Sequence, residues 1–194
     1  MLVGIDLDEV LSDFVRTYLV YYNSLNGTNF RREQTHTYKF WEVLGGNRDE
    51  AIKSVYDFYK TQLFADLPTM TGSQEGINNL ARKNDLVVIT SRPVDIREAT
   101  LDWLERNFPK RFREVYLTNQ WAKVSRGRSK ATICREVGID VIVEDSLEYA
   151  QECSKEIKKV VLFDCPWNQS EGLPQNICRV KSWNGVLAYF NGQN

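Results

Sequence analysis

The sequence is poor in the residues that build zinc centres and disulfide frameworks. It has one histidine, His36, and four cysteines that lie far apart with no Cys-x-x-Cys pair. A tetrahedral zinc site needs clustered sulfur and nitrogen ligands, and a small secreted scaffold needs paired cysteines. We therefore expect no zinc site, and we expect reduced thiols of the kind found in the cytoplasm.

Long apolar runs and a strong net charge are also lacking. No stretch of 18 apolar residues occurs, so we expect no membrane partner, and the first residues lack the basic leader of a signal peptide. Lys and Arg total 25 against 26 Asp and Glu, which gives a formal net charge of −1. Such a balance offers no global field for nucleic acid, so we expect a small-molecule partner instead.

Short apolar runs rich in Val and Ile alternate with helical patterns along much of the chain. The runs lack the polar alternation of a sheet that faces water, so they predict buried strands. The predicted strands are 2–6, 86–91, 114–118, 140–145 and 160–164, and the helices between the later strands are 95–108, 129–138 and 146–156. Alternating strands and helices predict an α/β fold, a Rossmann-like doubly wound parallel sheet.

One long segment departs from this alternation. Between about 15 and 75 we find helical candidates at 13–25 and 48–63, with an aromatic stretch at 36–46 between them, and no convincing strand. A helical insertion of this length directly after the first strand is too long for a simple crossover. We therefore expect a small helical cap (15–75) over a Rossmann-like core (1–14 and 76–194).

Polar and acidic residues collect where the predicted strands end. In open parallel sheets, ligands bind beyond the carboxyl ends of the strands. The residues at these ends are Asp6 and Asp8, then Thr90, Ser91 and Arg92, then Glu144 and Asp145. Two carboxylates about 4 Å apart repel by roughly 4 kcal/mol at an effective dielectric near 20, so a cation is needed among them. Oxygen ligands without clustered histidine or cysteine favour Mg²⁺.

A carboxylate beside a divalent cation can attack phosphorus. We take Asp6 as the nucleophile and Asp8 as the group that protonates the leaving oxygen and then activates water. The phosphoryl oxygens need donors, for which Thr90 and Lys130 are candidates. Lys123 is the weaker lysine candidate.

Four motifs in this order resemble those of the haloacid dehalogenase superfamily of phosphohydrolases. The motifs are "DLDEV" at 6–10, "ITSRP" at 89–93, Lys130 and "VEDS" at 143–146. Within the superfamily the chain most resembles the 5'(3')-deoxyribonucleotidases and their bacterial and viral nucleotidase relatives. "DLDEVLSDF" is similar to their first motif, and "LFDCPWN" at 162–168 to their closing segment.

That resemblance implies a role for each motif residue. Asp6 would be phosphorylated, and Asp8 would act as acid and base. The implied Mg²⁺ ligands are Asp6, the carbonyl of Asp8, and Asp145, with Glu144 as a further candidate. The implied phosphate and base contacts are Thr90, Ser91 and Lys130 for the phosphate and Phe14 for stacking on the base.

Two positions depart from the family pattern. Glu9 stands where a glycine usually follows the second aspartate, and we expect it to crowd the entrance or to repel the leaving group. Glu144 stands where the family has aspartate, so we expect its longer side chain to reach the metal through water. Both departures bear on the substrate more than on the reaction.

Simpler roles stay open for several of these residues. Ser91 fits a helix cap, Arg92 fits a brace for its loop as well as a substrate contact, and Lys130 fits a solvated helix start. Glu144 fits a partner for a nearby basic group. The aromatic residues Tyr38, Phe40 and Trp41 fit either a core or a substrate pocket that stacks on a nucleobase.

The residues thus favour a Mg²⁺-dependent phosphomonoesterase that acts on deoxynucleoside monophosphates. The same chemistry fits another metabolite phosphate or the 3' end of a nucleic acid, although the net charge disfavours the polymer. A module that binds a nucleotide without cleaving it is a further alternative. Family likeness suggests a homodimer.

Overall fold

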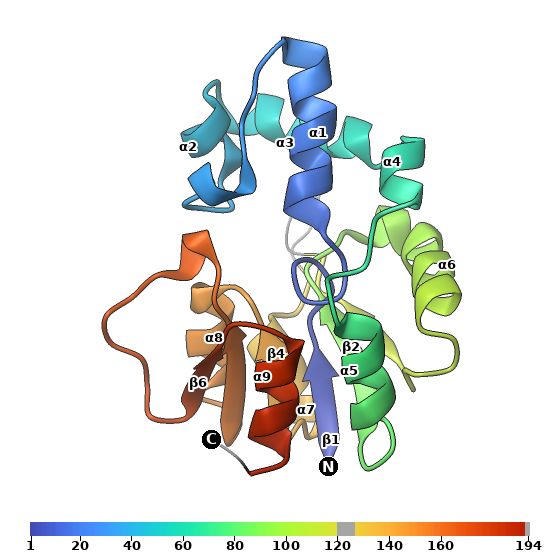
Figure 1. The fold of residues 1–194 in the computed structure, drawn as a ribbon, viewed down its shortest axis with the longest axis vertical. Helices are drawn as coiled ribbons and strands as arrows, with labels where there is room; N and C mark the ends of the chain where they lie inside the picture. Colours follow the sequence, from blue (N-terminus) through green and yellow to red (C-terminus); the bar gives the residue numbers. More distant parts are fainter. Residues whose placement is uncertain (120–126, 193–194) are drawn as a thin grey trace.

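The computed structural model describes residues 1–119 and 127–192, which form a parallel sheet of six strands with helices on both faces. The strands lie in the order β3-β2-β1-β4-β5-β6, of which Figure 1 labels β2, β1, β4 and β6. Their bounds are Leu2–Ile5 (β1), Asp85–Thr90 (β2), Val115–Leu117 (β3), Val141–Glu144 (β4), Lys159–Phe163 (β5) and Ile177–Val180 (β6). The α/β doubly wound class predicted from the sequence is confirmed.

The five strands predicted from the sequence correspond to β1–β5, with ends that differ by at most one residue. Sequence reasoning missed β6. This strand is only four residues long and reads Ile-Cys-Arg-Val, so it lacks the apolar run that marks the others. It pairs with β5 at the edge of the sheet.

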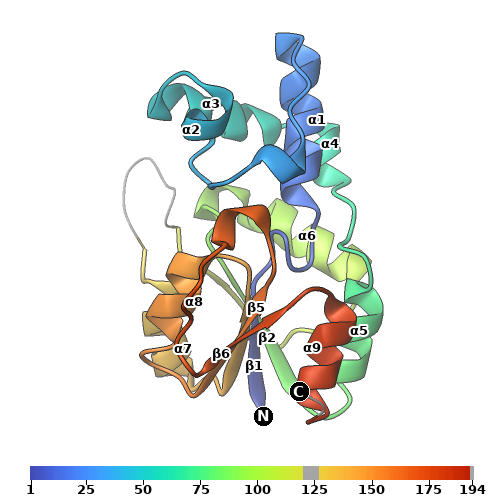
Figure 2. The same cartoon turned by 60° about the vertical axis from the view of Figure 1, so that its left-hand side comes forward.

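Successive residues of the buried strands point to opposite faces of the sheet, as the two-residue repeat of a strand requires. Leu86 and Val88 join one apolar cluster, whereas Val87 and Ile89 join the other. The first cluster is covered by α5 (Ser73–Leu80), α6 (Arg97–Asn107) and α9 (Trp183–Phe190), and the second by α7 (Lys130–Val137) and α8 (Leu147–Cys153). Figure 2 shows α7 and α8 on one side of the sheet and α5 and α9 on the other.

Serine caps fix where α7 and α8 begin. The Ser129 side chain accepts a hydrogen bond from the backbone N–H of Thr132, and α7 ends at Gly138, whose φ of 75° suits glycine. The Ser146 side chain likewise accepts from the backbone N–H of Tyr149. Lys130 therefore starts its helix at a defined place beside the carboxyl end of β4.

Residues 14–65 form helices that lie together beyond the carboxyl ends of the strands (Figure 1). They are α1 (Phe14–Asn26), the 3₁₀ turn η1 (Arg32–Gln34), α2 (Phe40–Leu44), α3 (Arg48–Phe58) and α4 (Gln62–Ala65). The helix predicted over 48–63 is two helices, because Thr61 caps a new one. Tyr18 lies at the centre of their packing, 4.7 Å from the Phe40 ring. Within the described ranges, no helix is both long and apolar enough to cross a bilayer.

Candidate active site

The carboxyl ends of β1, β2 and β4 lie side by side. β1 pairs with β2 on one side and with β4 on the other, and the two neighbours of β1 are reached by crossovers on opposite faces of the sheet. Asp6 follows β1, and its backbone N–H donates to the carbonyl of Val143 at 2.9 Å. Thr90 and Glu144 are the last residues of β2 and β4. The sheet therefore brings together the polar ends that the sequence singled out.

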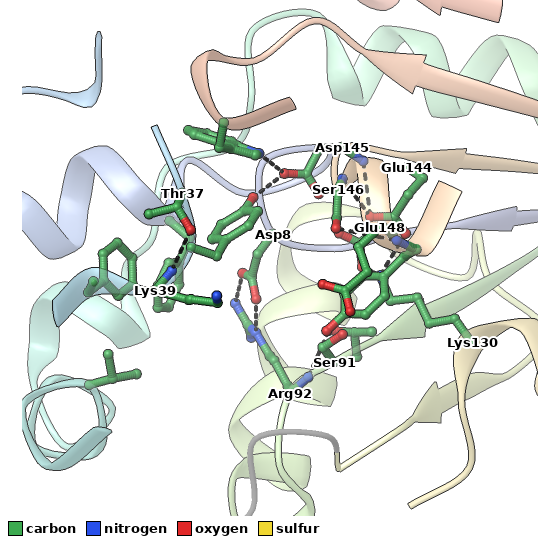
Figure 3. A pocket seen from close by; sticks show the side chains of 18 of the residues that line it. Asp8, Thr37, Lys39, Ser91, Arg92, Lys130, Glu144, Asp145, Ser146 and Glu148 are labelled. Carbon is green, nitrogen blue, oxygen red and sulfur yellow. Dashed lines mark hydrogen bonds and ion pairs between the residues drawn. The ribbon is translucent and has the colours of Figure 1, made fainter. Parts of the chain in front are cut away.

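Three buried carboxylates meet at this edge. Asp6, Glu144 and Asp145 each place one carboxylate oxygen within 4.8 Å of the other two. The Lys130 ammonium donates to Asp6 Oδ1 at 2.6 Å and to Glu144 Oε2 at 2.7 Å. Lys130 is 1% exposed, so it is a buried ion-pair partner and not a solvated helix start. Figure 3 shows Lys130, Glu144 and Asp145 grouped beside the pocket.

The charge of this group suits a hard divalent cation. Three carboxylates and one ammonium leave two unbalanced negative charges. Burial raises the pKa of Asp6 to about 7 and the pKa of Asp145 well above its usual value, and the neighbouring Glu144 carboxylate raises both further. Oxygen ligands carrying a surplus negative charge are what Mg²⁺ or Ca²⁺ binds. The residues present therefore fit the expected metal.

Glu144 has a second set of contacts that explains its length. Its Oε1 accepts the backbone N–H groups of Asp145 at 3.1 Å and Ser146 at 2.9 Å, while Oε2 faces Lys130. Both oxygens are thus used within the protein. The contacts favour Glu144 as the partner that holds Lys130 and the turn into α8, rather than as a direct metal ligand.

Asp8 lies apart from the trio and is held by an arginine. Arg92 donates to it from Nε at 3.0 Å and from Nη2 at 2.7 Å, and the Ser12 hydroxyl donates at 2.8 Å. Arg92 is 3% exposed, and its Nη1 donates to the Thr100 hydroxyl. Of the two roles left open for Arg92, these contacts favour the brace. Figure 3 shows the Asp8 carboxylate facing Arg92.

Asp145 is held by two aromatic donors. The Tyr38 hydroxyl and the Trp167 indole N–H both donate to its Oδ2, the latter at 2.9 Å. The Tyr38 and Trp167 rings lie 4.8 Å apart between centroids. Burial and the charge of Asp145 raise the pKa of Tyr38 well above its usual value, so the hydroxyl stays a donor.

A pocket of about 450 Å³ opens above these residues. Twelve candidate residues from the described part of the chain line it, namely Asp6, Asp8, Phe14, Tyr38, Phe40, Trp41, Thr90, Ser91, Arg92, Lys130, Glu144 and Asp145. Phe14 and Phe40 are only 6% and 7% exposed, because both pack into the aromatic cluster around Tyr18. They therefore offer the pocket little more than an edge, whereas Trp41 is half-buried.

Sequence reasoning missed a wall of this pocket. Ile52, Val55, Tyr56 and Tyr59 of and just after α3 line it. Their spacing of three and four residues marks one helix face and could have been recognised. Trp167 and Tyr149 also line the pocket, and for them the sequence carried no signal beyond their nearness to the motifs.

Glu9 does not crowd the entrance, which corrects the expectation from the sequence. It is fully buried and is not among the residues that line the pocket. Its φ of 66° turns the side chain inward, where it accepts from the Val15 backbone N–H at 2.6 Å and pairs with Arg32 at 2.8 Å. Burial raises the pKa of Glu9 to about 7. The residue anchors the start of α1 and the η1 turn.

Lys123 lies outside the described residues. Ser91 lines the pocket but does not cap a helix, since α6 begins after Ile96 without a side-chain cap.

Comparisons with known proteins agree with this geometry. The family model for "5' nucleotidase, deoxy (pyrimidine), cytosolic type C" matches residues 1–190. The chain is 24% identical to a 5'(3')-deoxyribonucleotidase of Bacillus subtilis over 189 residues, 95% of each protein. It is also 24% identical to a nucleotidase of Clostridium acetobutylicum, covering 95% of this chain and 90% of that one. The HAD hydrolase YfnB of Bacillus subtilis, solved bound to magnesium, superposes with a TM-score of 0.63 at 13% identity, covering 97% of each chain.

The sheet order and the structural likeness show that the chain shares its α/β fold with this solved hydrolase. The family match extends over nearly all of the chain. The protein belongs to the 5' nucleotidase, deoxy (pyrimidine), cytosolic type C family and is a phosphoric monoester hydrolase of the nucleotidase class.

Proposed function

We propose that this protein is a Mg²⁺-dependent phosphatase of deoxynucleoside monophosphates that works through an aspartyl-phosphate on Asp6. The observation that carries the proposal is the buried group of Asp6, Glu144, Asp145 and Lys130 at the floor of an aromatic pocket. The similarity to a 5'(3')-deoxyribonucleotidase supports a deoxynucleotide substrate, and the similarity to a hydrolase solved with bound magnesium supports the metal.

In this proposal Asp6 attacks phosphorus, and the bond from phosphorus to the ester oxygen breaks. Asp8 gives its proton to the leaving oxygen, then takes a proton from the water that attacks the phosphoenzyme. Arg92 and Ser12 hold the Asp8 carboxylate in place for both steps. The second step returns both aspartates to their starting state and releases inorganic phosphate.

Lys130, Thr90 and Ser91 bind the phosphoryl oxygens. Lys130 already lies 2.6 Å from Asp6, so its ammonium is next to the atom that forms the new bond. Asp6, Asp145 and the carbonyl of Asp8 would hold Mg²⁺, which when bound neutralises the carboxylates and the phosphate so that two anions can approach each other.

The aromatic side of the pocket accounts for the substrate class. We propose that residues 15–75 act as a cap over the core of residues 1–14 and 76–194, and that the base lies under this cap. Trp41 offers a half-buried ring, and α3 offers the apolar face of Ile52 and Val55. A flat base suits such a wall better than a sugar does. Phe14 and Phe40, which are almost fully buried, pack behind this wall of the pocket.

The test is a substrate panel at fixed Mg²⁺ with the Asp6→Asn variant. Deoxynucleoside monophosphates should release phosphate faster than a sugar phosphate or a 3'-phosphorylated oligonucleotide, and Asp6→Asn should remove the activity while its circular dichroism spectrum is unchanged. Undiminished phosphate release from the variant would exclude the mechanism. Equal rates on non-aromatic esters would exclude base stacking, and tight nucleotide binding without release would favour a binding module.

Location and assembly are further parts of the proposal. The four cysteines are free in the described residues, which suits the reducing cytoplasm. A homodimer remains a prediction from family likeness, and sedimentation of the purified protein would test it.

A further inference from the structure

We propose that Tyr38 and Trp167 are positioning residues that orient Asp145 for the metal, and that Tyr38 thereby links metal affinity to the docking of residues 15–75. The inference rests on the proposed function, because it takes Asp145 as a metal ligand. It assigns Tyr38 a task other than stacking on the base.

The hydrogen bonds on Asp145 are one-sided. Tyr38 and Trp167 both donate to Oδ2, and in the described part of the chain no other side chain donates to this carboxylate. Two donors in different directions fix the rotation of a carboxylate, and because both use Oδ2 they leave Oδ1 without a side-chain donor. One oxygen of the Asp145 carboxylate lies in the group formed with Asp6 and Glu144. An aspartate held this way loses little freedom when a cation binds.

The Trp167 donor belongs to a rigid part of the core. It lies in the 3₁₀ turn η3 (Pro166–Asn168), directly after β5. The next residue, Asn168, is fully buried and donates from Nδ2 to the backbone carbonyls of Asp145 at 2.6 Å and Phe163 at 2.5 Å. The Arg32 guanidinium, which comes from η1 and so from the same segment as Tyr38, adds a contact 4.7 Å from the centroid of the Trp167 ring. The indole direction is thus set from several sides.

Tyr38 comes from the other part of the molecule. It lies between η1 and α2, within the helices that cover the carboxyl ends of the strands (Figure 1). Its hydroxyl reaches Asp145 only while this segment rests on the core, where Arg32 also pairs with Glu9. If the segment lifts, Asp145 keeps Trp167 but loses Tyr38. Metal affinity and docking of the segment must then influence each other by the same factor.

The direct test measures metal binding without substrate. Mn²⁺, which serves here as a paramagnetic stand-in for Mg²⁺, is titrated into the whole protein and free ion is followed by electron paramagnetic resonance. Tyr38→Phe and Trp167→Phe each keep a ring but remove one donor, and each should weaken Mn²⁺ binding about 10-fold or more, the range found for outer contacts of metal ligands. Tyr22→Phe, a tyrosine of α1 outside the pocket, is the matched control and should bind as the wild type does.

A second measurement addresses the link to docking. Mn²⁺ should slow amide hydrogen exchange over residues 32–40 in the wild type and in Tyr22→Phe, but much less in Tyr38→Phe. Equal Mn²⁺ affinity in all four folded proteins would overturn the positioning role and leave the proposed function standing. If Tyr38→Phe binds Mn²⁺ more weakly than the wild type, but Mn²⁺ slows amide exchange over residues 32–40 equally in both, the link to docking would be overturned. No Mn²⁺ binding by the wild type would overturn this inference together with the metal-dependent function.

Discussion

Replacing Glu9 by glycine has two opposing effects on the free energy of unfolding. It relieves backbone strain, and it removes the ion pair with Arg32. Glu9 adopts a left-handed φ of 66°, which costs a residue with a side chain roughly 1–2 kcal/mol. Glycine removes this cost but loses about 0.5–1 kcal/mol through its freer unfolded chain. The backbone alone therefore predicts a gain of about 0.5–1 kcal/mol.

The side chain predicts the opposite. Glu9 is fully buried and pairs with Arg32, whose side chain is only 16% exposed. Removal of one partner from a buried ion pair costs about 3–5 kcal/mol, because the other charge stays behind. The Val15 backbone N–H also loses its acceptor. The net expectation for Glu9→Gly is a loss of about 2–4 kcal/mol in the free energy of unfolding.

Lys110→Gly is the matched control. Lys110 has a φ of 57°, is exposed, and has no ion pair among the described residues. Glycine there should stabilise the protein by the backbone gain alone, about 0.5–1 kcal/mol. Urea unfolding at pH 7 in EDTA measures both variants. A Glu9→Gly protein as stable as the wild type would refute the reasoning, since it would mean that the Arg32 pair contributes nothing.

Three further predictions concern the active site. Lys130→Met removes the ammonium that pairs with Asp6 and Glu144, so urea unfolding in EDTA should show a loss of about 3–5 kcal/mol in the free energy of unfolding, which Mg²⁺ partly restores. An unchanged free energy of unfolding would contradict the buried ion pairs. In EDTA the free energy of unfolding should fall as pH rises from about 4 to about 7, because burial raises the pKa of Asp6 to about 7 and that of Asp145 well above its usual value, so the folded state holds protons that the unfolded state has released. Mg²⁺ should flatten this slope, and a rise of stability over the same range would contradict the raised pKa values of these two carboxyl groups. Arg92→Lys removes the paired hydrogen bonds from the guanidinium to the Asp8 carboxylate, so steady-state kinetics should show kcat lowered about 100-fold with little change in KM. An unchanged kcat would mean that these two hydrogen bonds do not position Asp8.

The local features of the fold could be predicted from the sequence because each is encoded within a few residues. The apolar runs marked β1–β5, and the caps Ser129 and Gly138 marked the ends of α7. The acids at the strand ends were found because parallel strands must bring their carboxyl ends together. β6 was missed because Arg179 interrupts its four residues, so they form no apolar run.

What could not be predicted depends on contacts between distant parts of the chain. Nothing near Glu9 indicates that its backbone turns left-handed and sends the side chain to Arg32. Nothing near Tyr38 indicates that its hydroxyl meets Asp145, 107 positions away. The sequence left Tyr38, Phe40 and Trp41 open between a core and a pocket, because which ring faces the cavity follows from how α1 and α3 pack around Tyr18.

The most direct test of the central claim uses Asp8→Asn and p-nitrophenyl phosphate with Mg²⁺. This leaving group departs without a proton, so the variant should still form the phosphoenzyme, whereas hydrolysis stalls without the base. We predict a burst of about one nitrophenolate per protein, with mass spectrometry locating the phosphoryl group on Asp6. Phosphorylation of another residue, or steady turnover by the wild type with neither burst nor phosphorylated Asp6 in the folded variant, would contradict the account.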